Sequence, residues 1–280
     1  MPTPGSEVHD PSALPNGPVL DWFHATFVGG PTPAQRLAWP VIAAGENLLL
    51  VSPTGTGKTL AAFLAILARL HAEHAAGTLT PGLRCVYVSP LRSLGYDIER
   101  NLATPLEQVR QTLGLDRTPV SVGVRTGDTS AYQRRKLRDA PPHLLITTPE
   151  SLSLLLSQEP WQPHWKRVEH MIVDEVHALV PTKRGADLAV SLERLAARAD
   201  RDPARLGLSA TCRPADPVAR FLVGPGRTCR VVEAPLPDGS PPLRLDVESL
   251  LKPDEASHRG LTYRRLLRRL GLLLLWRPRR

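Results

Sequence analysis

Short apolar runs alternate along the chain with longer segments in which apolar residues return every three or four positions. The apolar runs, rich in Leu, Val and Ile, predict strands at residues 47–52, 84–89, 120–124, 143–147, 168–173 and 205–209. The segments with helical periodicity predict helices at residues 58–71, 93–111, 129–138, 149–157 and 185–199. Strands that are apolar throughout and are separated by helices indicate a parallel sheet buried on both faces. We therefore predict an α/β fold with a doubly wound parallel sheet.

Proline, glycine and charge divide the chain into four parts. Residues 1–18 are polar and rich in Pro and Gly, which predicts a flexible arm. One globular domain is expected over residues 19–234, followed by a linker over residues 235–258. Residues 259–280 form a basic amphipathic tail, a type of segment that can lie on an anionic membrane or on nucleic acid.

The positive charge of the chain lies in this tail. Lys and Arg number 35 against 27 Asp and Glu, a net charge of +8. Residues 258–280 contain eight Arg and no acid, which leaves residues 1–257 balanced at 27 against 27. Net charge therefore does not support nucleic-acid binding by the globular part, and any such site has to rest on individually placed residues.

The remaining composition narrows the class of protein. A hydrophobic fraction of 42% excludes a wholly disordered chain, and no apolar run is long enough to span a bilayer. The N-terminus lacks the basic start and apolar stretch of a secretory signal. The three Cys are widely spaced without a C-x-x-C pair, which argues against a disulfide framework or a zinc site. We expect a cytoplasmic protein with no membrane partner.

The strongest local signal is SPTGTGKT at residues 52–59, between an apolar strand and a helix. The general phosphate-loop pattern has Gly at its first position, where this chain has Ser52, so only the variant ending in G-x-G-K-T is matched. Glycines let the loop backbone wrap a phosphate, Lys58 would reach the β and γ phosphates, and Thr59 would bind magnesium. The alternative is an ordinary strand-to-helix turn that contains glycine. The predicted nucleotide contacts are Thr54, Gly55, Thr56, Gly57, Lys58 and Thr59, with ATP and Mg²⁺ as cofactors.

A second candidate is MIVDEVH at residues 171–177, an apolar strand that ends on two acids. Ligands of parallel sheets gather at the carboxyl ends of the strands, where Asp174 and Glu175 would lie beside the phosphate loop. Asp174 would hold Mg²⁺ and Glu175 would orient and deprotonate the attacking water. A solvated turn is the alternative for the acids, and a structural role is the alternative for His177.

These segments belong to an ordered series of motifs. The series comprises PTPAQ at 31–35, SPTGTGKT at 52–59, YVSPLRSLGYDIERNL at 87–102, VRTGDT at 124–129, TTPESL at 147–152, DEVHAL at 174–179, KRG at 183–185 and GLSAT at 207–211. The chain resembles the first RecA-like domain of superfamily 2 nucleic-acid helicases, most closely the large helicase-related (Lhr-type) DExH proteins. The resemblance covers roughly 200 residues, and such agreement in spacing is difficult to reach by accident.

The resemblance implies further roles in the nucleotide site. Gln35 would read the adenine edge with Phe27 as a stacking residue, although a buried or capping Gln is an open alternative. His177 would link the ATP site to Ser209 and Thr211 and so couple hydrolysis to movement. A buried strand end is the alternative for the segment LSAT.

The resemblance also implies a nucleic-acid surface made of three segments that follow predicted strands. Backbone N–H groups and hydroxyls there could hold phosphates without a high net charge, in a sequence-independent way. Polar caps without a ligand are the alternative, and Lys183 and Arg184 would face the strand, the partner domain or solvent. The predicted contacts are Ser89, Pro90, Arg92, Arg125, Thr126, Gly127, Thr148, Pro149 and Glu150, with single-stranded or duplex DNA favoured over RNA and DNA repair as the setting.

Helicases of this family need a second RecA-like domain, and the sequence does not contain its motifs. We interpret the tail as a remnant of that domain, and expect the isolated chain to hydrolyse ATP barely, since an arginine finger contributes about 10³ to 10⁵ in rate. Two functions stay open: the ATPase half of a helicase, and a module that binds nucleotide or nucleic acid without turnover.

Overall fold

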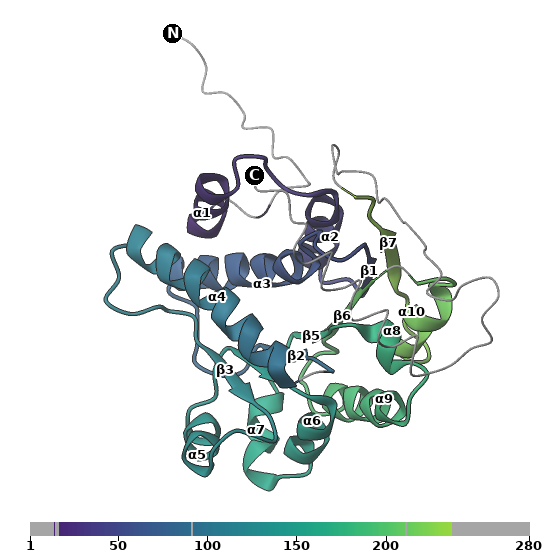
Figure 1. Ribbon diagram of the computed structural model, residues 1–280. Helices are drawn as coiled ribbons and strands as arrows, with labels where there is room; N and C mark the ends of the chain where they lie inside the picture. Colours follow the sequence, from purple (N-terminus) through teal and green to yellow (C-terminus); the bar gives the residue numbers. More distant parts are fainter. Residues whose placement is uncertain (1–13, 15–16, 91, 211, 237–280) are drawn as a thin grey trace, which may run out of the picture. The chain divides into compact units, whose positions relative to one another are not determined.

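The computed structural model describes residues 14, 17–90, 92–210 and 212–236 (Figure 1), and the side chains of residues 92–101 lie outside this description. The chain divides into two units, Met1–Asp238 and Gly239–Arg280, and every described residue belongs to the first. Most of the expected arm, nearly all of the linker, the whole tail and Thr211 lie outside the described residues.

The described residues build a seven-stranded sheet with the order β3-β4-β2-β5-β6-β1-β7, in which every neighbouring pair is parallel. The strands are β1 Leu48–Val51, β2 Cys85–Val88, β3 Val122–Arg125, β4 Leu144–Thr147, β5 His170–Val173, β6 Ala204–Ser209 and β7 Arg230–Glu233. Strands β5, β6 and β1 are parallel neighbours, so the segments that follow them lie together at the carboxyl-terminal ends of the strands, where such sheets bind ligands.

Helices cover both faces of this sheet. They are α1 Pro18–Thr26, α2 Pro33–Ala43, α3 Lys58–Ala75, α4 Arg92–Thr112, α5 Ala131–Asp139, α6 Pro149–Leu156, the 3₁₀ helix η1 Glu159–Trp161, α7 Gln162–Trp165, α8 Val176–Leu179, α9 Lys183–Ala196 and α10 Asp216–Val223. Figure 1 shows α3 and α4 on one side of the central strands, and α6 and α9 on the other.

Two hydrophobic cores result because successive strand residues point to opposite faces. In β1, Leu48 and Leu50 pack with α1 to α4, whereas Leu49 and Val51 pack with α6 and with α8 to α10. All four residues are almost wholly buried, which explains why the strand is apolar at every position. The predicted doubly wound parallel fold and all six predicted strands are confirmed, with shifts of one or two residues at most ends.

The sequence did not reveal seven elements of the described region: the strand β7, the helices α1, α2, α7, α8 and α10, and the 3₁₀ helix η1. Strand β7 reads RVVE and lies at the sheet edge, with its outer residues exposed, so it lacks an apolar run. Helices α1 and α2 are short and begin with proline, and the side chain of Thr32 caps α2. Leu14 is fully buried in the core on the α1 side, and Pro18 already belongs to α1, so the N-terminal segment predicted as a flexible arm is packed at these two positions.

No helix among the described residues is both long enough and apolar enough to cross a bilayer.

Candidate functional site

The predicted phosphate loop, residues 52–59, connects β1 to α3 and has the backbone of an anion site. Gly55 and Gly57 adopt φ values of 81° and 82°, a left-handed conformation that favours glycine. Gly57 is the N-cap of α3, and no side chain caps this helix. The first N–H groups of α3 are therefore left for an anion, which the positive end of the helix also attracts.

The departure from the general pattern at Ser52 has a structural use. Its hydroxyl donates to the hydroxyl of Thr56 over 2.8 Å, and Thr56 in turn donates to the carbonyl of Pro53 over 2.8 Å. From outside the loop, the Thr32 hydroxyl donates to the Thr56 carbonyl over 2.9 Å. Ser52 and Thr56 are buried, so both brace the loop from within, while Thr54 lines the open cleft.

Lys58 lies folded over this loop. Its Nζ donates to the carbonyls of Ser52 at 2.6 Å and Pro53 at 2.8 Å, and the side chain is 8% exposed. Burial lowers the pKa of Lys58, whereas the charges of Glu175 and Asp174 oppose that shift. The ammonium is thus held between the loop and the two acids that the sequence singled out.

Asp174 emerges from the end of β5 into an enclosed position, 5% exposed. Its Oδ1 accepts from the backbone N–H of Glu175 at 2.9 Å, and its Oδ2 accepts from the hydroxyl of Tyr87. Burial raises the pKa of Asp174, while these two hydrogen bonds lower it. Tyr87 escaped the sequence prediction because it reads as one more apolar position of β2, and no local pattern marks a partner 87 residues away.

Glu175, His177 and Ser209 form a chain of polar contacts beside Asp174. Glu175 Oε2 lies 3.4 Å from His177 Nδ1, which in turn lies 3.1 Å from the hydroxyl of Ser209. Glu175 has φ 47° and is the one described non-glycine residue with a positive φ. These contacts link the end of β5 to the end of β6, as the resemblance implies. Thr211 lies outside the described residues.

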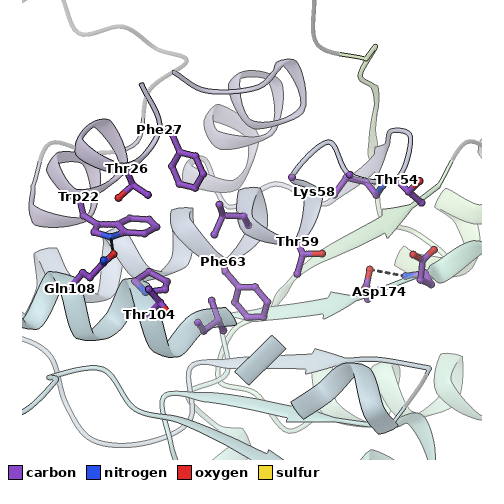
Figure 2. A pocket seen from close by; sticks show the side chains of 16 residues that line it. Trp22, Thr26, Phe27, Thr54, Lys58, Thr59, Phe63, Thr104, Gln108 and Asp174 are labelled. Carbon is purple, nitrogen blue, oxygen red and sulfur yellow. Dashed lines mark hydrogen bonds between the residues drawn. The ribbon is translucent and has the colours of Figure 1, made fainter. Parts of the chain in front are cut away.

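A cleft of about 700 Å³ opens along the phosphate loop and beneath α1. Figure 2 shows Lys58, Thr59 and Asp174 toward one end of this cleft and the rings of Trp22 and Phe27 toward the other. Thr54, Gly55, Gly57 and Glu175 also line it. The charged and apolar ends match the two ends of a nucleotide, since phosphates need N–H donors and cations while a base needs apolar surface.

Gln35 takes part in a capping box rather than standing free. Its Oε1 accepts from the backbone N–H of Thr32 at 2.8 Å, while its own N–H donates to the Thr32 hydroxyl at 3.3 Å. The side chain is buried, and its Nε2 lies 3.2 Å from the position that a Cβ on Gly57 would occupy. Phe27 is partly exposed and lines the cleft, against Phe23 with ring centroids 4.9 Å apart.

Two oxygen-bearing side chains beside the phosphate loop suit a small hard cation. Thr59 and Asp174 both line the cleft, and such oxygens are the ligands that Mg²⁺ prefers. The described residues contain no cluster of three or more His, Cys, Asp or Glu that would hold a metal by itself. The donor set therefore fits a magnesium ion completed by phosphate oxygens and water.

The three segments predicted to contact nucleic acid follow β2, β3 and β4, which are neighbours in the sheet. Ser89 and Pro90 follow β2, and Ser89 donates its N–H to the Thr147 carbonyl at 2.9 Å. Arg92 begins α4, and its side chain lies outside the described part. The segments thus lie side by side at the same edge as the phosphate loop, as the resemblance implies.

Arg125 ends β3 with its guanidinium largely enclosed, 5% exposed. Its Nη1 donates to the carbonyl of Thr126, and no described carboxylate pairs with it. Burial, with a smaller effect from the charge of Arg134, lowers the pKa of Arg125. A buried cation without an anionic partner is costly, so an anion near this position would be stabilising.

The other predicted contacts are partly occupied by local caps. Thr126 is buried and donates its N–H to the Thr129 hydroxyl at 2.9 Å, and the carbonyl of Gly127 accepts from Arg134. Thr148 is the N-cap of α6, and its hydroxyl accepts from the N–H of Ser151. Pro149 is also buried, so capping, the alternative considered for these residues, is present in the fold.

The two basic residues at the start of α9, Lys183 and Arg184, have different surroundings. Glu150 forms an ion pair with Arg184, which also donates to the carbonyl of Pro90 at 2.9 Å. Lys183 is exposed at the first position of α9. Arg184 therefore contacts two of the three predicted nucleic-acid segments.

Comparison with known proteins identifies the chain as similar to helicases. Residues 32–218 match the DEAD/DEAH box helicase family. The ATP-dependent helicase Lhr-Core protein 2 of Thermococcus barophilus is 48% identical over 210 residues, 74% of this chain and 24% of the relative. The Lhr helicase/probable uracil glycosylase of Mycolicibacterium smegmatis is 46% identical over 243 residues, 82% of this chain and 16% of the relative.

Solved structures agree with these relatives. The Mycobacterium smegmatis helicase Lhr bound to ssDNA and AMP-PNP is similar with a TM-score of 0.75 and 41% identity, over 92% of this chain and 32% of that one. The DEAD-box helicase Mss116 bound to ssRNA and UDP-BeF is similar in fold, with a TM-score of 0.66 and 19% identity, over 82% of this chain and 46% of that one. The chain thus spans about a quarter or less of the length of the two curated relatives, 24% and 16%.

Proposed function

The chain belongs to the DEAD/DEAH box helicase family and corresponds to the first RecA-like domain of its Lhr-type members, and we propose that it forms the nucleotide-binding half of an ATP-dependent helicase. A second RecA-like domain would close the ATP cleft and supply the arginine finger. Directional movement along nucleic acid would follow from that closure.

The observation that carries the proposal is the meeting of two distant segments in one cleft. The phosphate loop offers backbone N–H groups and Lys58, and Asp174 and Glu175 face it from the end of β5. This combination provides groups for binding a triphosphate and also a carboxylate for activating water. A simple glycine turn would explain the first segment and leave the second without a purpose.

Each side chain has a proposed part in hydrolysis. Lys58 exchanges its carbonyl partners, Ser52 and Pro53, for the β and γ phosphates. Thr59 and Asp174 hold the magnesium ion, which neutralises charge on the phosphates when bound. Glu175 accepts the proton of the attacking water.

The contacts of Glu175 with His177 and of His177 with Ser209 supply a route for coupling hydrolysis to movement. Both contacts lie within 3.4 Å and connect the strand that carries the acids to the strand that carries the LSAT segment. A change in the position of Glu175 would therefore move His177 and, through it, Ser209 at the end of β6. Thr211 is proposed as the continuation of this route.

We propose Gln35 and Phe27 for the base. Phe27 lines the cleft and offers a partly exposed ring, which suits stacking. Gln35 keeps its Nε2 and the second lone pair of Oε1 for the base edge while Oε1 accepts from Thr32. The capping box would then hold the amide in a fixed orientation.

The segments after β2, β3 and β4 are proposed as the nucleic-acid surface, with single-stranded DNA as the favoured ligand. Support comes from the buried guanidinium of Arg125, which pairs with no carboxylate of the described residues, and from the N-termini of α4 and α6, which follow two of these strands. The similar Mycobacterium smegmatis helicase was solved with ssDNA. DNA repair is the proposed setting.

Isothermal titration of the 280-residue chain with a non-hydrolysable ATP analogue and Mg²⁺ tests the nucleotide site. We expect weak binding that Lys58→Ala abolishes and that Lys166→Ala, a change at an exposed residue, leaves intact. Equal affinities of the wild type and Lys58→Ala would reject the phosphate-loop assignment.

A further inference from the structure

Tyr87 is buried beneath the predicted cation site, at the point where β2 passes β5. Its relative exposure is 0%, and its hydroxyl donates to Oδ2 of Asp174. The side chain of Thr59 lies close enough to the same hydroxyl to lower the pKa of Tyr87, against the raising effect of burial. The tyrosine hydroxyl therefore bonds to one of the two side chains whose oxygens suit a magnesium ion and lies beside the other.

The direction of these bonds follows from the number of protons. A tyrosine hydroxyl carries one proton, which goes to the carboxylate of Asp174, so toward the neighbouring Thr59 hydroxyl its oxygen can act only as an acceptor. A Thr59 proton directed at this oxygen would point away from the cleft and leave the Thr59 lone pairs for a cation. Asp174 has Oδ1 occupied by the Glu175 N–H and Oδ2 by Tyr87, which fixes the plane of its carboxylate.

The ring of Tyr87 is itself held in place. It stacks on Phe63 of α3 with centroids 4.9 Å apart and an interplanar angle of 25°. Strand β2 pairs with β5 in a register that sets Tyr87 beside Ile172, two residues before Asp174. The hydroxyl thus has a defined position, anchored by the sheet on one side and by α3 on the other.

We propose that Tyr87 is a positioning residue for magnesium, which orients Thr59 and Asp174 through its single hydroxyl. This inference rests on the proposed nucleotide site and adds to it a residue outside the phosphate loop and the acidic strand end. Groups that orient metal ligands change metal affinity by about 10- to 100-fold when they are removed. A purely structural tyrosine would affect folding stability and leave the magnesium dependence of nucleotide binding unchanged.

The test compares Tyr87→Phe with Tyr132→Phe in the full chain. The first removes the buried hydroxyl and retains the ring on Phe63, whereas the second removes the hydroxyl of a tyrosine that is 70% exposed on α5. A fluorescent ATP analogue is titrated in EDTA and at a series of Mg²⁺ concentrations. For Tyr87→Phe we expect the half-maximal Mg²⁺ concentration to rise about tenfold, with affinity in EDTA unchanged and Tyr132→Phe equal to wild type.

A half-maximal Mg²⁺ concentration equal to that of wild type in Tyr87→Phe would overturn the positioning role and leave the nucleotide site standing. Nucleotide binding that is indifferent to Mg²⁺ in the wild type would do the same. Wild-type affinity in Lys58→Ala would instead overturn the proposed function, and the role of Tyr87 with it.

A second measurement uses the chain with Tyr87 in place, so the test does not depend on whether Tyr87→Phe folds. The chain has four Tyr, so 3-fluorotyrosine gives four ¹⁹F signals, and that of Tyr87 is assigned by elimination with Phe variants of the other three. Adding Mg²⁺ to the complex with the ATP analogue should shift the Tyr87 signal beyond the change caused by nucleotide alone. An unchanged Tyr87 signal would overturn the proposal.

Discussion

The guanidinium of Arg184 pairs with the carboxylate of Glu150 and also donates to the carbonyl of Pro90 at 2.9 Å. It thereby connects the first turn of α9, the first turn of α6 and the loop after β2. The arginine lowers the pKa of Glu150, so the carboxylate stays charged and paired. Glu150 was predicted as a nucleic-acid contact, and this pairing favours a different part for it, as a brace between two segments of the proposed nucleic-acid surface.

If the Arg184–Glu150 pair acts as a brace, removing either residue should weaken nucleic-acid binding to a similar degree. Arg184→Ala and Glu150→Gln should each weaken single-strand binding about threefold, because a partly exposed ion pair contributes a fraction of 1 kcal/mol. Arg201→Ala, at an exposed position, is the control. Fluorescence anisotropy of the single and double variants provides the measurement. Additive effects in the double variant would contradict a shared brace.

A chain that ends at Asp238, the boundary of the first compact unit, separates the surface after β3 from the arginine-rich tail. We expect this chain to retain part of the single-strand affinity and to lose it on Arg125→Ala. Three to five phosphate contacts imply a log–log salt slope of about −2 to −3.5, from about −0.7 per phosphate. Loss of all binding on truncation would assign the affinity to the tail.

Glu175 carries backbone strain at the position proposed for water activation. A non-glycine residue in the left-handed region costs about 1 kcal/mol, and Asn tolerates that region better. Glu175→Asn should therefore raise the melting temperature by about 2 to 4 °C. Glu175→Gln removes the same charge and keeps the strain, so it should show no such rise. Differential scanning calorimetry of the two variants tests the strain.

Hydrolysis by the 280-residue chain should lie near background. No arginine among the described residues lines the cleft, and a finger contributes about 10³ to 10⁵ in rate. Turnover is expected to rise when a second RecA-like domain is supplied, and Glu175→Gln should prevent that rise. Robust turnover stimulated by nucleic acid in the chain alone, lost in Glu175→Gln, would contradict this prediction.

Two buried histidines predict a loss of stability in acid. Burial lowers the pKa values of His71 and His170 from 6.5 to about 4. The unfolded chain therefore binds protons before the folded one does. The stability contributed by the neutral forms is complete above pH 6.5 and is lost as pH falls toward about 4, up to roughly 3 kcal/mol for each histidine.

His71 isolates this effect because both of its ring nitrogens are buried with no hydrogen-bond partner in the part of the chain that the structure describes. His71→Leu should weaken the dependence of unfolding free energy on pH between 6.5 and 4, as measured by urea denaturation at several pH values. His24→Gln, at an exposed position, should leave the dependence unchanged. A pH dependence in His71→Leu identical to that of wild type would show that His71 does not contribute.

What the sequence determined by itself is local in the chain. Strand β1 is predictable because both of its faces are buried and every position is apolar, and β5 follows the same pattern after its first residue, His170. The phosphate loop is predictable for a related reason, since its strand, its glycines with positive φ, Lys58 and Thr59 are consecutive. Strand β7 is the counterexample, because an exposed edge strand needs no apolar run.

Only the tertiary structure decided which side chains meet. Tyr87 contacts Asp174 across 87 residues of chain, and Arg184 contacts Pro90 across 94. Hydrogen bonds of this kind depend on strand order and register, which arise when both faces of the sheet are buried at once. Burial stabilises in proportion to apolar area, whichever apolar residues are buried, so the apolar pattern of a strand does not specify its neighbour in the sheet.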